Sequence, residues 1–161
     1  MTDTPAIRLA DYTPPAWLVE DVDLTFRLDP AETRVLSSIR FRRNPGASGD
    51  FTLNGEGLKL IEARIDGQKP NGLHQTETGL SLPGDTLPDT FLWEAEVEIA
   101  PRDNTALEGL YMSNGMYCTQ CEAEGFRRIT FYPDRPDVMA PFRTRIESDE
   151  PVLLSNGNPT A

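Results

Sequence analysis

The sequence is poor in histidine and cysteine, the residues that most often hold zinc. Its 161 residues include one histidine, His74, and two cysteines, Cys118 and Cys121. A closed structural zinc site needs four ligands, so a structural zinc is disfavoured. Cysteines this close together also close too small a loop to stabilise a domain of this length. The fold must therefore depend on a hydrophobic core, which a chain of this size can bury.

Positive charge and long hydrophobic runs are also scarce. Lys and Arg number 15 against 26 Asp and Glu, for a formal net charge of −11. Such a charge repels the phosphates of nucleic acids and the surfaces of anionic membranes, so neither is expected as a partner. No stretch approaches the run of about eighteen apolar residues that spans a bilayer, and the N-terminus lacks the pattern of a secretory signal. We expect a soluble, cytoplasmic protein.

The hydrophobic pattern that is present has a period of two. In residues 91–99 apolar side chains alternate with mostly acidic ones, which is typical of a half-buried antiparallel strand. The same alternation in 22–28 and 35–41, with Asp29-Pro30 between them, predicts a hairpin. Long helices are disfavoured by 14 prolines and 12 glycines spread along the chain. Shorter strands are expected at 51–55, 58–67, 79–84, 142–149 and 151–157.

These patterns predict one all-β domain over residues 1–161 with little helix. We expect either a β-sandwich or strongly curved, saddle-like antiparallel sheets. Most other conspicuous residues have a structural interpretation. Arg127 and Arg128 are expected in weak surface ion pairs, Asp134 and Asp137 as turn or cap residues, and His74 in a solvated loop. The large aromatic residues are expected in the core or at a domain contact: Trp17, Trp93, Phe126 and Phe131.

The segment YCTQCEAEGFRRITFYPDRPD, residues 117–137, breaks the alternation and crowds polar groups together. Cys118-x-x-Cys121 is half of many zinc sites, but the other ligands are missing. A thioredoxin-like redox pair needs a βαβ unit, which this chain does not offer. The preferred interpretation is that the cysteines pack as small apolar residues at a tight turn.

Gln120 and Glu122 lie two residues apart in the same segment. In extended backbone their side chains project to one side while Cys121 points away. The carboxylate suits the α-ammonium of a peptide, whose unperturbed pKa is about 7.7 to 8.0, and the amide can both donate and accept hydrogen bonds. Spacing alone favours a simpler interpretation, that both are solvated loop residues.

The run GLYMSNGMYCTQCEAEGFRRITFYPDRPDVMAPF, residues 109–142, resembles the N-terminal domain of the bacterial aminopeptidase N family of zinc metallo-aminopeptidases. The resemblance implies a saddle of β-sheets that packs on a thermolysin-like catalytic domain and contributes a Gln-Cys-Glu loop to its active site. By this resemblance Glu122 would bind the N-terminal amine of a peptide substrate. Gln120 would line the pocket for the first side chain.

With a single histidine, the chain cannot contain the His-Glu-x-x-His zinc motif of that family. We therefore expect the zinc, and the catalysis, to belong to a catalytic domain of the same polypeptide, with no catalytic or metal-binding residue in this chain. The domain is expected to continue past Ala161. Two other function classes remain open: a non-catalytic β-sandwich that binds protein or carbohydrate, and a stand-alone redox module.

Overall fold

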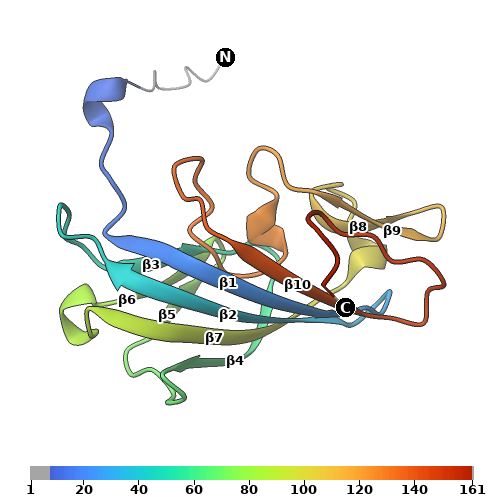
Figure 1. Ribbon diagram of the computed structural model, residues 1–161, viewed down its shortest axis with the longest axis horizontal. Coiled ribbons are helices and arrows are strands. Elements are labelled where there is room, and N and C mark those ends of the chain that lie inside the picture. The colour runs from blue at the N-terminus through green and yellow to red at the C-terminus, as the bar shows by residue number, and fades with distance from the viewer. Residues whose placement is uncertain (1–7, 161) are drawn as a thin grey trace.

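A computed structural model describes residues 8–160 of the chain (Figure 1). The fold is all-β, as the alternation predicts, and each helical segment within these residues is a single 3-10 turn of three residues. No helix in the described part of the chain is long and apolar enough to cross a membrane. The elements in order are η1 (Leu9–Asp11), β1 (Trp17–Arg27), β2 (Thr33–Arg43), β3 (Phe51–Asn54), β4 (Lys59–Ile65), β5 (His74–Thr76), β6 (Gly79–Leu82), η2 (Gly84–Thr86), β7 (Thr90–Ile99), η3 (Pro101–Asp103), β8 (Gly109–Ser113), β9 (Met116–Gln120), η4 (Phe126–Arg128) and β10 (Phe142–Glu147).

The largest sheet has five strands in the order β10-β1-β2-β7-β4. The predicted hairpin is confirmed, since β1 and β2 pair antiparallel with Val22 opposite Ile39. The strand predicted at 91–99 is β7, and its apolar residues are buried while its glutamates lie on the other face. One edge departs from the prediction of antiparallel sheets. Strand β10 runs parallel to β1, because a long connection from Ile99 onward returns the chain to that edge.

A second sheet, in the order β3-β6-β5, covers one face of the large sheet (Figure 1). Phe51 of β3 lies at the centre of the contact, with its ring centroid 4.8 Å from Phe41, 5.1 Å from Phe91 and 5.6 Å from Trp93. Trp17 closes this cluster at 5.2 Å from Phe91. Edge-to-face aromatic contacts of this kind add to the burial of apolar area, so this cluster is the main hydrophobic core.

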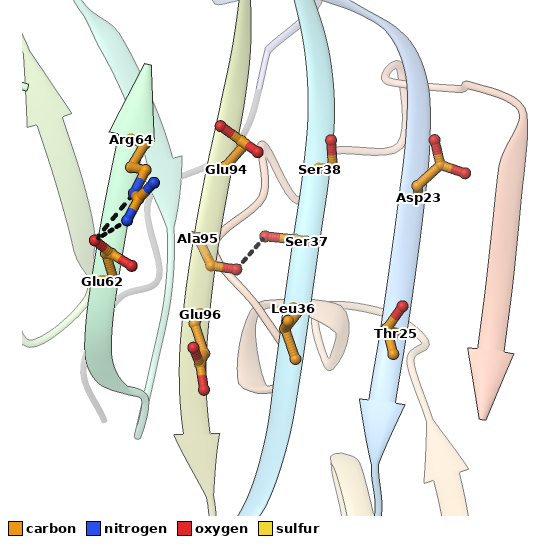
Figure 2. Close-up of a pocket in the computed structure, with 10 residues that line it drawn as sticks. All are labelled: Asp23, Thr25, Leu36, Ser37, Ser38, Glu62, Arg64, Glu94, Ala95 and Glu96. Atoms are coloured by element: carbon orange, nitrogen blue, oxygen red, sulfur yellow. Dashed lines mark hydrogen bonds and ion pairs between the residues drawn. The ribbon is translucent and has the colours of Figure 1, made fainter. Parts of the chain in front are cut away.

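The opposite face of the large sheet carries charged and polar side chains (Figure 2). Arg34 of β2 bridges Glu96 and Glu98 of β7 at 2.9 and 3.1 Å. Arg64 of β4 pairs with Glu62 at 2.8 Å. These ion pairs are partly exposed and contribute little to stability. This polar face is the side of the sheet that contacts water.

The strand predicted at 151–157 is wrong. These residues have no regular structure, and Val152, Leu153 and Leu154 are exposed. An apolar run becomes a strand only when a partner strand satisfies its backbone groups, and this run has none among residues 8–160. By contrast, the strands expected near 51–55, 58–67, 79–84 and 142–149 are present as β3, β4, β6 and β10.

Candidate functional site

The segment that broke the alternation begins in a hairpin made of β8 and β9. Its turn is Asn114-Gly115, with φ of 50° and 82°. These positive values suit the tight turns that join hairpin strands, where Asn-Gly is a preferred pair. The sequence patterns described above did not predict these two strands. The register sets Gly109 opposite Gln120, so Gln120 is the last residue of β9.

Two glycines fix the base of the loop that follows β9. The N–H of Gly125 donates to the carbonyl of Cys121 at 2.9 Å and closes the turn. A Cβ added to Gly125 would lie 2.2 Å from the carbonyl oxygen of Gln120 and 2.9 Å from the nitrogen of Gly109. Gly109 itself has φ +71°, a conformation that L side chains rarely adopt. The loop of residues 120–125, here called the Gln-Cys-Glu loop, is therefore held against the start of β8.

The structure brings Gln120 and Glu122 together on this loop. The side-chain amide of Gln120 donates to the backbone oxygen of Glu122 at 3.1 Å. Both residues are exposed. The carboxylate of Glu122 makes no hydrogen bond or ion pair with any residue between 8 and 160. An exposed carboxylate with no cation beside it is free to bind a cationic group from outside the chain.

Arg127 contacts the Gln-Cys-Glu loop and is largely buried. Its Nε and its backbone N–H both donate to one carboxylate oxygen of Asp134 at 3.1 Å, and Nη2 donates to the Asp134 carbonyl at 3.1 Å. The same Nη2 lies 3.3 Å from a carboxylate oxygen of Glu124 in the loop, and Nη1 lies 3.8 Å from Glu56. Only 14% of the Arg127 side chain and 12% of the Asp134 side chain are exposed.

The prediction of a weak surface pair is therefore wrong for Arg127. Charged groups that lose this much water need partners on most of their polar atoms, and Arg127 has them. The prediction holds for Arg128, a half-exposed residue that pairs with Glu56 at 2.9 Å and Glu108 at 3.2 Å. Asp134 does bind a backbone N–H, as a cap residue would, but its main partner is a guanidinium.

Residues 129–132 tie the loop to the core. Ile129 and Phe131 are buried, and the hydroxyl of Thr130 donates to Ser37 at 3.2 Å. Ser37 in turn donates to the carbonyl of Ala95 at 3.4 Å, a bond drawn in Figure 2. Tyr132 pairs with Asn54 through two backbone hydrogen bonds of 2.8 and 3.1 Å. This burial of both faces, by apolar and polar groups together, explains why the segment shows no alternation.

The two cysteines are both free thiols. Cys118 is half-buried in β9, and Cys121 lies at the predicted turn but is exposed, so the prediction that both pack as small apolar residues is wrong for Cys121. Partial desolvation of its sulfur, and then the nearby carboxylate of Asp134, raise the pKa of Cys121. A redox-active thiol needs the opposite shift. No group of three or more His, Cys, Asp or Glu residues that could hold a metal is found within residues 8–160.

His74 and the predicted core aromatics can also be placed. His74 lies in the exposed edge strand β5 rather than in a loop. Trp17, Trp93 and Phe131 are buried in the core, and Phe126 packs against it. Asp137 accepts a hydrogen bond from the hydroxyl of Tyr12 at 2.9 Å and pairs with Arg135, so it holds the N-terminal segment rather than a helix.

A separate hollow of about 400 Å³ lies on the outer face of the large sheet (Figure 2). It is shallow and open, and its walls come from β1, β2, β4 and β7 rather than from the Gln-Cys-Glu loop. Sugar sites usually combine exposed aromatic rings with polar groups, and none of the residues that line this hollow is aromatic. The hollow therefore gives no support to a carbohydrate-binding module. It is lined by Asp23, Thr25, Leu36, Ser37, Ser38, Glu62, Arg64, Glu94, Ala95 and Glu96.

Comparison with known proteins gives matches along most of the chain. Residues 24–161 match the family model of the peptidase M1 N-terminal domain. The chain is 50% identical to aminopeptidase N of Caulobacter vibrioides over 99% of its length, and 44% identical to aminopeptidase N of Escherichia coli over 100%. In both cases it spans 19% of the relative.

Solved structures give the same picture. The fold superposes on Legionella pneumophila aminopeptidase A, solved in complex with aspartic acid, with a TM-score of 0.83 and 30% identity, over 94% of this chain and 18% of that one. The M1 zinc metallopeptidase of Deinococcus radiodurans has a TM-score of 0.68 at 17% identity, over 83% of this chain and 32% of that one. At that identity the likeness concerns the fold alone.

Proposed function

The chain belongs to the peptidase M1 N-terminal domain family, and we propose that residues 1–161 form the N-terminal β-domain of a zinc aminopeptidase that releases single amino acids from peptide N-termini. Support comes from the 50% and 44% identity to proteins named aminopeptidase N. Because the chain spans only 19% of these relatives, the catalytic domain would lie in the rest of the same polypeptide.

Zinc would be held by that catalytic domain. The described residues offer no cluster of ligands for a metal, so they do not fit the cofactor themselves. A zinc ion in such an enzyme supplies electrophilic activation of the peptide carbonyl and of water. The contribution of this chain would be to bind and orient the substrate, and the chain alone would be inactive.

The single observation that carries this role is the free carboxylate of Glu122. The Gln-Cys-Glu loop has two carboxylates, and they differ in their surroundings. Glu124 is paired with Arg127 at 3.3 Å, whereas Glu122 has no cation beside it among residues 8–160. A peptide's α-ammonium, largely charged at neutral pH, would find its partner in Glu122.

Binding the ammonium at a fixed point would set which peptide bond meets the catalytic groups. Fixing a substrate in this way lowers the barrier by removing its freedom of motion before the reaction. It also explains removal of one residue at a time, because an internal or acetylated nitrogen presents no ammonium to the carboxylate. We propose that Glu122 selects the chain end by this contact.

Gln120 would line the pocket for the first side chain. Its amide nitrogen is engaged by the Glu122 backbone at 3.1 Å, which fixes the side chain on the loop. Its amide oxygen has no partner among the described residues and stays available to a substrate. The role of Gln120 would thus be specificity rather than anchoring.

The test is Glu122→Gln in the complete enzyme, assayed on one peptide with a free N-terminus and on its acetylated form. In the complete enzyme the catalytic domain would cover this exposed loop, and breaking a pair of charges that has lost its water costs about 2 to 5 kcal/mol. This corresponds to a loss of about 30- to several-thousand-fold in kcat/KM for the free peptide. Zinc content should not change. Gln120→Ala should alter the ranking of first residues more than the mean rate.

The matched control is Glu108→Gln, which removes the same charge from a half-exposed residue next to Gly109 that pairs with Arg128. It should leave kcat/KM within about twofold, as expected for an exposed pair. If Glu122→Gln spares cleavage of the free peptide as well as the control does, Glu122 is a solvated loop residue and the anchor assignment is wrong.

A further inference from the structure

The guanidinium of Arg127 is held in place by Asp134, which lies outside the Gln-Cys-Glu loop. Three of its donors, the backbone N–H, Nε and Nη2, bind the carboxylate and carbonyl of one residue, Asp134. A planar guanidinium held at several points has lost its freedom to rotate, so its remaining N–H groups point in set directions. With 14% of its side chain exposed, it also feels little screening by water.

The free side of this guanidinium faces two other segments. Nη2 reaches Glu124 of the Gln-Cys-Glu loop at 3.3 Å, and Nη1 approaches Glu56, in the connection between β3 and β4, at 3.8 Å. The backbone N–H of Glu56 donates to the carbonyl of Arg127 at 3.0 Å. Arg127 thus connects the loop to the end of β3, and β3 contributes the central aromatic residue of the core, Phe51.

The same contacts give the two carboxylates of the loop, Glu122 and Glu124, different surroundings. Arg127 pairs with Glu124 at 3.3 Å, so this carboxylate, although 71% exposed, has a counter-charge beside it and attracts a further cation less strongly. Glu122, two residues earlier, keeps its charge free. A loop with two equivalent carboxylates could hold an ammonium in two positions, and only one position would align a peptide bond with the catalytic groups.

We propose that Arg127 is a positioning residue for the aminopeptidase reaction. Held by Asp134, it pairs with Glu124, fixes the Gln-Cys-Glu loop, and leaves Glu122 as the carboxylate of this loop that receives the substrate ammonium. Arg127 itself does not contact the substrate. This inference rests on the proposed function of Glu122.

The experiment is a double-mutant cycle between Arg127→Met and Glu122→Gln in the complete enzyme, with kcat/KM measured on the free-amine peptide. In the wild-type background Arg127→Met should lower kcat/KM about 10- to 100-fold, the range for a misplaced binding group. In the Glu122→Gln background the same change should cost no more than about twofold, since its effect passes through Glu122. Zinc content reports an intact catalytic domain in every variant, and urea titration reports the folding of this domain.

Arg128→Met is the matched control. It removes the same charge one residue later, and its ion pairs go to Glu56 and Glu108 rather than to Glu124. It should leave kcat/KM within about twofold of the wild type, because its pairs are half-exposed. Arg127→Met leaves the Asp134 carboxylate unpaired and could prevent folding. In that case the double variant Arg127→Met/Asp134→Asn, which removes both charges, takes its place in the same cycle.

The outcomes separate the two proposals. If Glu122→Gln costs activity but Arg127→Met lowers kcat/KM no more than Arg128→Met does, the positioning role is overturned while the amine anchor stands. An equal loss from Arg127→Met in both backgrounds also overturns it, since it would show a structural defect unconnected to Glu122. If Glu122→Gln alone has no effect, the anchor proposal itself has failed.

Discussion

The five-stranded sheet and the segment from Gly109 to Asp134 are stabilised by different kinds of contact. The buried face of the sheet is almost entirely apolar, with Val35, Ile39 and Trp93 fully buried. The segment buries polar groups as well, including the guanidinium of Arg127 and the hydroxyl of Thr130. Apolar packing is nearly independent of direction, whereas hydrogen bonds and ion pairs need set distances and angles. Apolar packing in the sheet stabilises the domain, and the directional contacts of the segment fix the position of the Gln-Cys-Glu loop.

The two regions are joined at a few points. Thr130 bonds Ser37 of β2, and Asn54 of β3 shares two backbone hydrogen bonds with Tyr132. These bonds lie within seven residues of Gly125, which fixes the base of the Gln-Cys-Glu loop. A change in the core should therefore act on the stability of the domain, while a change near Gly125 should act on the position of the loop.

The largest expected effect on stability comes from the core. Trp93→Ala removes a fully buried side chain from the contact with Phe51. The expected loss is about 3 to 5 kcal/mol in the free energy of unfolding, from lost apolar burial and the cavity left behind. Urea titration of the complete enzyme measures it. If the proposed function holds, the enzyme that remains folded should cleave free peptides in preference to acetylated ones.

The control for this change is Glu94→Gln, the next residue of β7, whose side chain lies on the outer face (Figure 2). Its neighbour Arg64 pairs with Glu62 instead, so Glu94 has no ion pair among the described residues and its change should shift stability by no more than about 0.5 kcal/mol. Similar losses from both changes would show that the two faces of the sheet do not differ as described.

A smaller effect is expected from two glycine substitutions with nearly the same steric conflict. A Cβ at Gly125 would lie 2.2 Å from the carbonyl oxygen of Gln120, and one at Gly84 would lie 2.1 Å from that of Gly49. Each alanine should destabilise the protein by about 1 to 3 kcal/mol, as overpacking typically does. The two should differ in catalysis, because only Gly125→Ala displaces the Gln-Cys-Glu loop.

The comparison is made on kcat/KM of folded enzyme, corrected for zinc content. Gly125→Ala should lower it about 10-fold or more, in line with a binding group moved out of place. Gly84→Ala should lower stability with little change in kcat/KM. Equal catalytic losses from both would mean that loop position follows global stability, against the separation of the two regions.

The fold was predictable where one rule decides the structure. Period-two alternation places β1, β2 and β7, because a half-buried strand must turn every second residue inward. It missed β5, a short and fully exposed edge strand, and it placed a strand at 151–157 that has no partner. It also could not give the parallel pairing of β10, which depends on the path of a long connection.

The site was less predictable from local pattern. Gln120 and Glu122 were proposed as site residues from a resemblance, while their spacing alone favoured solvated residues. The largely buried ion pair of Arg127 and Asp134 was missed. No local sequence rule shows that two charged residues seven positions apart will pair and be buried. The signal that existed was the Asn114-Gly115 pair, since a turn of that type predicts a hairpin on both sides. The second strand of this hairpin, β9, ends at Gln120 and so positions the Gln-Cys-Glu loop.

The smallest expected effect lies at the junction of the two regions, in Tyr132. Its side chain is 4% exposed, and its hydroxyl has no hydrogen-bond partner among residues 8–160. Burial, and secondarily the carboxylate of Asp134, raise the pKa of Tyr132 to about 12. In the unfolded chain a tyrosine ionises near pH 10. Between about pH 10 and 12 the unfolded state therefore loses a proton that the folded state keeps, and stability falls as pH rises.

Tyr132→Phe should remove this fall. At pH 7 the two proteins should differ little, because the hydroxyl has no bond to lose and the ring contacts with Phe126 at 4.9 Å and Phe142 at 5.9 Å remain. At pH 11 the wild type should have lost about 1.4 kcal/mol relative to the variant, since one pH unit of ionisation in the unfolded state alone is worth that much. Urea titrations of both proteins at pH 7, 9 and 11 measure the difference. If the two stability curves stay parallel up to pH 11, the hydroxyl of Tyr132 reaches water in the folded protein, and the junction between core and loop is less tightly packed than the structure has it.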